Sequence, residues 1–205
     1  MSVAAMILAA GQGVRFGQDS KLLAALDGKP LVRHVAEAAL ASMARPVIAV
    51  LGHRRVEVAQ ALRGLDVIAV DNPAFHDGLS TSLKAGFAAL PSAAEAAVVL
   101  LGDMPRVNAS LIDRLIAAWR AEGGPSAVVP AFGERRGNPV LLSRVLAPAI
   151  ANLTGDRGAG SFLRSRADVL ELGLTDPSIV QDVDTPESLE ALRRSWPRHR
   201  SPFQT

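Results

Sequence analysis

Short aliphatic runs alternate with longer stretches of helical periodicity along this chain of 205 residues. Such runs are typical of buried strands, and the stretches between them are typical of helices that pack on a sheet. The pattern predicts strands at residues 3–8, 46–51, 66–70, 96–101, 126–130, 139–142, 169–172 and 179–183. It predicts helices near residues 30–43, 54–63, 79–90, 108–121, 143–150, 159–166 and 186–195. We therefore expect an α/β fold with a mostly parallel sheet between two layers of helices.

The composition is that of one domain with a core of small aliphatic side chains. Hydrophobic residues make up 49% of the chain and charged residues 20%, with 35 Ala, six Phe, two Trp and no Tyr. A chain of this size buries a substantial core. We expect a single domain over residues 1–195 and a loose C-terminal tail over residues 196–205, which are polar and contain proline.

Charge and cysteine content exclude several classes of function. The sequence pI is about 9.6, but the formal net charge is only +2, because a chain without Cys or Tyr has few groups that titrate between His and Lys. With few aromatic residues to stack on bases, nucleic acid is not an expected partner. The lack of Cys excludes disulfides, thiolate nucleophiles and cysteine-ligated metals. No apolar run reaches membrane-spanning length and the N-terminus lacks a basic leader, so we expect a cytoplasmic protein without a membrane partner.

A glycine-rich loop follows the first predicted strand, at the sheet edge where ligands of parallel sheets bind. Its candidate phosphate-binding residues are Leu8, Ala9, Ala10, Gly11, Gly13, Arg15 and Lys21. Glycines let backbone N–H groups approach an anion, and the two cations would neutralise a polyphosphate. The spacing fits neither a P-loop nor the dinucleotide fingerprint, whose third glycine is replaced by Phe16. The alternative interpretation is a tight turn with two solvated cations.

Two carboxylates follow other predicted strands at the same edge. Asp103 comes after the fourth predicted strand, and Asp184 comes directly after the end of the last one. Mg²⁺ takes oxygen ligands and retains several waters, so two carboxylates and phosphate oxygens make a sufficient site. We expect Asp103 and Asp184 to hold Mg²⁺, in preference to Asp182, which shares a strand face with Asp184 but lies before the strand end. The structural alternative is that Asp103 begins a turn and Asp184 supports the helix cap at Thr185.

A further candidate region precedes the predicted helix at residue 79. Asn72 follows the third predicted strand, and Gly78, Ser80 and Ser82 lie at the helix start. Helix N-termini present free N–H groups that suit ligand oxygen atoms. Ordinary helix capping by either serine is the alternative, and His76 is assigned no role.

Taken together, these motifs resemble the single-domain nucleotidyltransferases, and among them the molybdenum cofactor cytidylyltransferases. The resemblance rests on Leu8-Ala9-Ala10-Gly11, Arg15-Phe16-Gly17, Lys21, Gly102-Asp103-Met104-Pro105 and the segment 182–187, and so spans residues 8–187. Ala10 stands where the guanylyltransferase relatives carry a second glycine. The resemblance implies a three-layer Rossmann-like nucleotidyltransferase fold, with Arg15, Lys21 and Asp103 as catalytic residues.

The resemblance also implies where the two substrates bind. The region of residues 72–82 would contact the base and sugar of the nucleotide. Two glycine turns are similar to the second-substrate motifs of the family, and their candidate residues are Gly137, Asn138, Pro139, Asp156 and Arg157. One position departs from the family pattern, because Gly160 stands where a basic residue is common.

The activity implied by the resemblance is the Mg²⁺-dependent transfer of CMP from CTP to molybdopterin, with release of pyrophosphate. A molybdenum hydroxylase or its chaperone would be the protein partner. Within the enzyme class, the alternatives are a guanylyltransferase that uses GTP and a cytidylyltransferase that acts on a sugar or polyol phosphate. A non-catalytic chaperone that delivers the cofactor is the alternative from another class, and the presence of Asp103 and Asp184 disfavours it.

Overall fold

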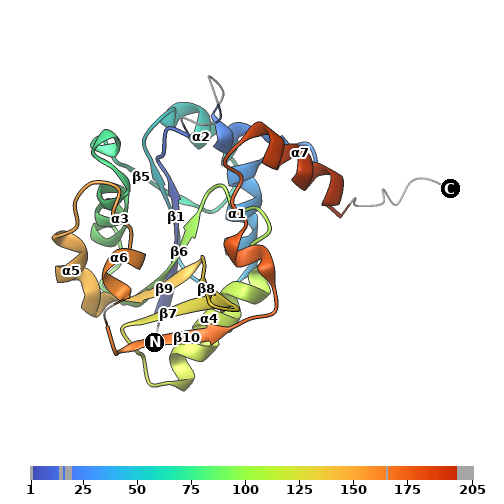
Figure 1. Ribbon diagram of the computed structural model, residues 1–205. Helices are drawn as coiled ribbons and strands as arrows, with labels where there is room; N and C mark the ends of the chain where they lie inside the picture. The colour runs from blue at the N-terminus through green and yellow to red at the C-terminus, as the bar shows by residue number, and fades with distance from the viewer. Residues whose placement is uncertain (1, 14–15, 17–19, 165, 198–205) are drawn as a thin grey trace.

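A computed structural model describes residues 2–13, 16, 20–164 and 166–197. In this part of the chain a central sheet lies between two layers of helices (Figure 1). The strands are β1 (Ser2–Ala9), β4 (Val47–Leu51), β5 (Ile68–Asp71), β6 (Ala94–Leu101), β7 (Ala127–Phe132), β8 (Arg135–Arg136), β9 (Val140–Ser143) and β10 (Val169–Gly173). A separate short hairpin consists of β2 (Ala25–Leu26) and β3 (Lys29–Pro30). The expected single-domain α/β fold is confirmed.

The sheet has eight strands in the order β10-β7-β9-β6-β1-β4-β5, with β8 paired to β7. The pairs β1–β4, β1–β6, β4–β5 and β7–β10 are parallel. β9 runs antiparallel to both β6 and β7, and β8 is antiparallel to β7. The sheet is therefore mostly parallel, and the carboxyl ends of β1, β4 and β6 meet at one edge.

Helices cover both faces of the sheet. On one face lie α1 (Leu31–Ala41), α2 (Arg55–Ala61) and α4 (Ala109–Ala121), and on the other lie α3 (Leu79–Ala88), α5 (Ala147–Ala151) and α6 (Gly160–Leu163) (Figure 1). The α7 helix (Pro186–Ser195) packs with the hairpin in a smaller third cluster. Short 3₁₀ helices are η2 (Lys21–Leu23), η3 (Phe75–Asp77), η4 (Arg144–Leu146) and η5 (Pro177–Val180). The core is continuous on each face because β1 and β6 are buried on both sides.

The strand predicted at residues 179–183 is wrong. Residues 177–180 form η5, and residues 181–184 have no regular secondary structure. Ile179 and Val183 are nonetheless buried, and the Val183 N–H donates to the Asp103 carbonyl over 3.0 Å. The aliphatic run was thus a signal of burial without a strand ladder, because periodicity alone does not separate the two in a short segment.

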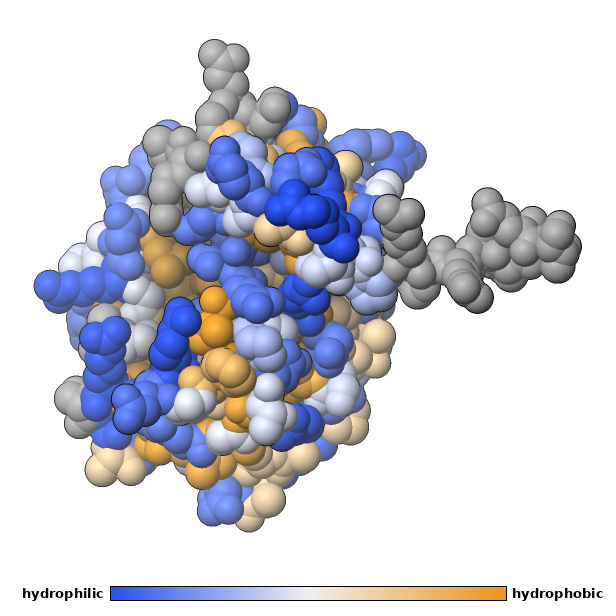
Figure 2. All heavy atoms as spheres, turned by 45° about the vertical axis from the view of Figure 1, so that its right-hand side comes forward, coloured by the Kyte–Doolittle hydropathy of each residue, from blue (hydrophilic) through white to orange (hydrophobic). Residues whose placement is uncertain are grey.

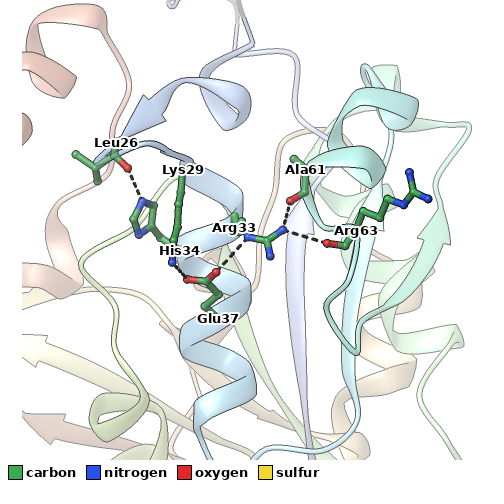
Figure 3. A network of polar contacts seen from close by, with 7 residues as sticks. All are labelled: Leu26, Lys29, Arg33, His34, Glu37, Ala61 and Arg63. Atoms are coloured by element: carbon green, nitrogen blue, oxygen red, sulfur yellow. Dashed lines mark hydrogen bonds and ion pairs between the residues drawn. The ribbon is translucent and has the colours of Figure 1, made fainter. Parts of the chain in front are cut away.

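A polar network fixes the segment between the glycine loop and α1. Arg33 donates to Glu37 over 3.1 Å and to the carbonyls of Ala61 and Arg63, at the end of α2, over 2.9 and 3.2 Å (Figure 3). The Lys29 ammonium, on the hairpin, lies 2.7 Å from the second Glu37 oxygen. These contacts hold the hairpin and α2 onto α1.

The second tie between the hairpin and α1 is His34, whose Nε2 donates to the Leu26 carbonyl over 2.7 Å (Figure 3). Trp196, the first residue of the expected tail, packs edge-on against the His34 ring with 5.2 Å between centroids. Residues 198–205 of that tail lie outside the described residues. The hairpin that follows Lys21 is therefore anchored from two directions.

The surface mixes polar and apolar side chains. Figure 2 shows hydrophilic side chains gathered over the upper part of one face, around α7, with apolar side chains showing nearer its centre. Among the described residues, no helix has the length and hydropathy that a membrane span requires.

Candidate active site

A cavity of about 490 Å³ opens at the carboxyl ends of β1 and β6. The predicted site residues that line it are Leu8, Ala10, Gly11, Gly13, Lys21, Gly78, Ser82, Asp103, Asp156 and Asp184. They come from the β1 loop, from the start of α3, and from three further segments that carry Asp103, Asp156 and Asp184. The structure therefore brings together residues that are far apart in the sequence, and we call this space the loop cavity.

The β1 loop reaches Lys21 through a turn that requires glycine. Gly13 has φ +59°, and a Cβ there would lie 3.1 Å from the Lys21 Cγ. A side chain at this position would thus be strained and would crowd the lysine stem. Ala9 is fully buried beneath the loop, and Arg15 lies outside the described residues.

Lys21 lies between the two predicted metal ligands. Its Nζ forms an ion pair with Asp103 and a second one with Asp184, the latter at 2.9 Å. The three side chains are 16%, 12% and 24% exposed, so the charges are largely removed from water. Two backbone contacts place the carboxylates, because the Gly102 N–H donates to the Leu8 carbonyl and the Val183 N–H to the Asp103 carbonyl. We call these three residues the buried charge cluster.

The pKa values of this cluster reflect competition between burial and pairing. Burial acts to lower the pKa of Lys21, but the contacts with Asp103 and Asp184 outweigh it and raise that pKa above its ordinary value. Burial raises the pKa of Asp103, and the pairing with Lys21 offsets only part of that rise. The ionised form of Asp103 would therefore be stabilised further by a cation of higher charge than the Lys21 ammonium.

The cluster fits a divalent cation of the Mg²⁺ type. Asp103 Oδ1 is buried and has no hydrogen-bond partner among the described residues, so one hard oxygen ligand is left over. Asp182, to which the sequence analysis preferred Asp184 as a metal ligand, also lines the loop cavity. The described residues contain no group of three or more His, Cys, Asp or Glu side chains arranged as a complete metal site. Phosphate oxygens and water would have to complete the coordination shell.

The expected residues before α3 divide into two kinds. Ser82 lines the loop cavity, whereas Asn72 is buried and donates to the hydroxyls of Thr81 and Ser82 over 2.9 and 3.0 Å. Asn72 therefore orients α3 from behind. The Ser80 hydroxyl is buried without a partner among the described residues, and no side chain from the N-cap position caps α3. Capping by Ser80 or Ser82 is thus not what these serines do.

Some residues that line the loop cavity were assigned no role from the sequence, and among them Gln12, Phe75 and His76 form a group. The Gln12 amide donates to His76 Nδ1 over 2.6 Å, and the Phe75 and His76 rings lie with centroids 3.9 Å apart. Phe75 also sits against Gly52, where an added Cβ would approach Ala10 and Phe75 to 2.7 Å. The sequence did not predict that Phe75 and His76 pack together beside the Gln12 amide, because this contact forms only where η3 meets the β1 loop.

A second cavity of about 490 Å³ adjoins the first and shares Leu8, Leu79, Leu101 and Asp156 with it. Gly137, Asn138 and Arg157 line it, together with Gly160 and Arg164, whereas Pro139 lines neither cavity. We call it the arginine cavity. Gly137 is needed here for a close approach, because a Cβ would collide with the Ile179 carbonyl. Arg164 lies where it can supply the positive charge that Gly160 lacks.

Comparisons with known proteins identify the family of this chain. The sequence profile of the MobA-like NTP transferase domain matches residues 5–169. Nicotine blue oxidoreductase from Paenarthrobacter nicotinovorans is 32% identical over 196 residues, which cover 93% of this chain and 96% of that protein. The crystal structure of an Rv0371c homolog from Mycobacterium sp. strain JC1 has a TM-score of 0.81 and 31% identity, over 94% of this chain and 96% of that one.

A third relative is Rv0371c from Mycobacterium tuberculosis H37Rv, whose crystal structure is a complex with manganese. It has a TM-score of 0.78 and 26% identity, over 95% of this chain and 100% of that one. All three relatives match this chain along nearly its whole length.

Proposed function

The chain belongs to the family of MobA-like NTP transferase domains, and on that premise we propose that it transfers CMP from CTP to molybdopterin. In this reaction an oxygen of the acceptor phosphate attacks the α-phosphorus of CTP. The bond from that phosphorus to the bridging oxygen breaks, and pyrophosphate leaves with the bonding electrons. Chemistry of this kind depends on positioning and electrostatic stabilisation and needs no covalent nucleophile.

The observation that carries the proposal is the buried charge cluster beside the β1 loop. Lys21 lines the loop cavity together with Gly11 and Gly13, whose backbone would cradle an anion within its reach. Its ammonium would bind the phosphates and stabilise the charge that moves onto the departing pyrophosphate. Arg15, two residues after Gly13 in the sequence, would add a second positive charge.

Asp103 and Asp184 would hold Mg²⁺, the cation that the unsatisfied oxygen of Asp103 favours. A bound divalent ion neutralises charge on the nucleotide phosphates. The manganese complex of Rv0371c supports a divalent ion in this fold. Ionised Asp103 and Asp184 would orient the phosphate chain through that ion, while Lys21 is freed to face the phosphates directly.

The choice of CTP over GTP rests on the back of the loop cavity. Ala10 is buried, and its Cβ lies close to Gly52, on which Phe75 packs. This wall limits the depth available to a base, so a pyrimidine should fit better than a purine. Shape discrimination of this kind is worth about 1–3 kcal/mol.

The acceptor would bind in the arginine cavity. Arg157 and Arg164 suit the phosphate of molybdopterin, and the apolar side chains of Leu83 and Val99 line the cavity where a flat heterocycle would lie. Gly137 and Asn138 would contact the acceptor from the opposite wall. The product would then pass to a molybdenum hydroxylase or to a chaperone of that enzyme.

A second candidate is an oxidoreductase, because the relative that matches over 93% of this chain is nicotine blue oxidoreductase. The β1 loop could hold the phosphates of a redox nucleotide equally well. Hydride transfer, however, has no need for two carboxylates around a lysine. The two functions therefore differ in their dependence on a divalent ion.

The test is a nucleotide panel with molybdopterin and Mg²⁺, scored by pyrophosphate release. We expect CTP to exceed GTP in kcat/KM by about tenfold or more, and the variant Ala10→Gly to narrow that difference. Equal turnover with both nucleotides would refute the assignment of CTP. Oxidation of NADH or NADPH that persists in EDTA, without pyrophosphate release from any nucleotide, would favour the oxidoreductase instead.

A further inference from the structure

We propose that Asp156 is a positioning residue that couples the two cavities, so that acceptor binding and nucleotide binding influence each other. The inference rests on the proposed function, in which each cavity holds one substrate. It departs from the sequence-based expectation for Asp156, which was direct contact with the acceptor.

The first observation is that Asp156 caps α3 from a distant segment. Its Oδ1 accepts from the Leu79 N–H over 3.4 Å, and the Gly155 carbonyl accepts from the Ser80 N–H over 3.1 Å. The N-cap position of α3 itself is Gly78, which has no side chain to do this. A carboxylate at a helix N-terminus satisfies free N–H groups and interacts favourably with the helix dipole. The start of α3 is therefore held by the turn at residues 155–156.

The second observation is that these two segments touch without a gap. Gly78 has φ +102°, and a Cβ there would collide with the backbone of Gly155. A Cβ at Gly158 would lie 3.0 Å from the Leu79 side chain. Backbone packed this closely transmits displacement, because neither segment can move without pushing the other. A shift of the turn therefore shifts the start of α3.

The third observation is where the coupled parts lie. Asp156 and Leu79 line both cavities, and α3 carries Ser82 into the loop cavity. Arg157, the next residue along, lines only the arginine cavity. A ligand bound by Arg157 thus acts on the turn that holds α3, and a nucleotide bound against α3 acts on the same turn.

Electrostatics argue against Asp156 as a direct ligand of the acceptor. The acceptor carries a phosphate, and a carboxylate beside it would repel that charge unless a cation separated them. The residues of opposite charge that line this cavity are Arg136, Arg157 and Arg164. The charge of Asp156 is instead favourable where the side chain accepts from the Leu79 N–H at the N-terminus of α3.

Coupling between two sites is reciprocal, so the factor by which the acceptor tightens CTP must equal the factor by which CTP tightens the acceptor. We expect the apparent affinity for CTP to rise in the presence of the acceptor in the wild-type protein. In Asp156→Ala that increase should be much smaller, because the turn loses its side-chain contact with Leu79 and holds α3 only through the backbone of Gly155. In Asp156→Asn most of it should remain, since the amide oxygen still accepts from Leu79.

The experiment compares the wild-type protein with Asp156→Ala, Asp156→Asn and Asn108→Ala. Asn108 is a matched control, because its side chain caps α4 through the Leu111 N–H over 2.9 Å and lines neither cavity. Hydrogen exchange at residues 79–82, measured without ligands, reports on the contact between Asp156 and the start of α3. Titration calorimetry with CTP, with and without molybdopterin and in EDTA so that no turnover occurs, measures the coupling.

We expect Asp156→Ala to exchange faster at residues 79–82 and to bind CTP about fivefold more weakly without acceptor, in line with the loss of a capping side chain. Asn108→Ala should match the wild type in both measurements. The inference is overturned if Asp156→Ala binds CTP as the wild type does and only its KM for molybdopterin rises. If the wild type binds no CTP, the proposed function fails, and unchanged exchange at residues 79–82 in Asp156→Ala would separately refute the link.

Discussion

Two groups of charged side chains in this molecule are built in opposite ways. In the buried charge cluster, Lys21 sits between Asp103 and Asp184 with all three side chains at most 24% exposed. In the network of Figure 3, Lys29 and Glu37 are 49% and 33% exposed, and Arg33 spreads its donors over a carboxylate and two carbonyls. In the second group both oxygens of Glu37 are paired, whereas in the first Asp103 Oδ1 has no hydrogen-bond partner among the described residues.

The pKa values express the same difference. At Glu37 burial acts to raise the pKa, but the hydrogen bonds and charges of Lys29 and Arg33 outweigh it and lower that pKa. At Asp103 burial wins, and the pKa is raised in spite of Lys21. A buried carboxylate whose desolvation is not fully offset by ion pairing destabilises the folded protein, and a role in function would explain why it is there. The comparison teaches that an incompletely satisfied buried cluster marks the site more reliably than the number of charges does.

The largest effect we expect is on turnover in Asp103→Ala. Removing this carboxylate takes away an expected metal ligand, so Mg²⁺-dependent pyrophosphate release should fall by at least about a hundredfold. The fold should persist, because the side chain lies at the sheet edge and contributes little apolar contact. The measurement is pyrophosphate release together with circular dichroism on the same sample.

The matched control for that variant is Glu37→Gln, which removes a carboxylate from the Figure 3 network. Its turnover should equal that of the wild type, since Glu37 lines neither cavity. If both variants lost activity to the same degree, the contrast between the two groups would collapse. Retained activity in Asp103→Ala would exclude it as a metal ligand.

The next effect in size concerns the two lysines, and the change is the same in each. Lys21→Arg should lower kcat by about ten- to a hundredfold, because a planar guanidinium cannot occupy the compact place of an ammonium between two carboxylates. Lys29→Arg should leave kcat unchanged, since Lys29 and its partner Glu37 are 49% and 33% exposed and the pair can adjust. Steady-state kinetics with CTP separate kcat from KM. A pure rise in KM for Lys21→Arg would make Lys21 a substrate anchor only.

The sequence was sufficient for the central strands and for the residues at their ends. The run before Asp103 is aliphatic throughout, and its pairing with β1 places Asp103 beside the glycine loop. The same reasoning wrongly predicted a strand at residues 179–183, because Ile179 and Val183 are buried in a segment that pairs with no strand. Asp184 nevertheless reaches the cluster, since one hydrogen bond from Val183 does what a strand ladder was expected to do.

Contacts between distant segments lay beyond the reach of the sequence. The bond between Gln12 and His76 joins residues 64 positions apart, and that between Leu79 and Asp156 joins residues 77 apart. Neither has a local signature, because a loop glutamine or histidine looks the same whether it is solvated or paired. Asn72 illustrates the converse, since its polarity suggested a ligand contact and its side chain is used inside the protein.

The smallest effect we expect is on stability, from Glu37→Gln. Because folding lowers the pKa of Glu37, its ionised form stabilises the protein at pH values above its unfolded pKa, and that contribution is lost as the pH falls through the lower folded pKa. Partial exposure screens the pair, so the variant should lose only about 0.5–1 kcal/mol at pH 7. Urea unfolding of both proteins at pH 7 and pH 3, in low and high salt, measures this. The difference should shrink at pH 3 and in high salt, and a difference that is independent of both would mean that Glu37 acts through packing instead of charge.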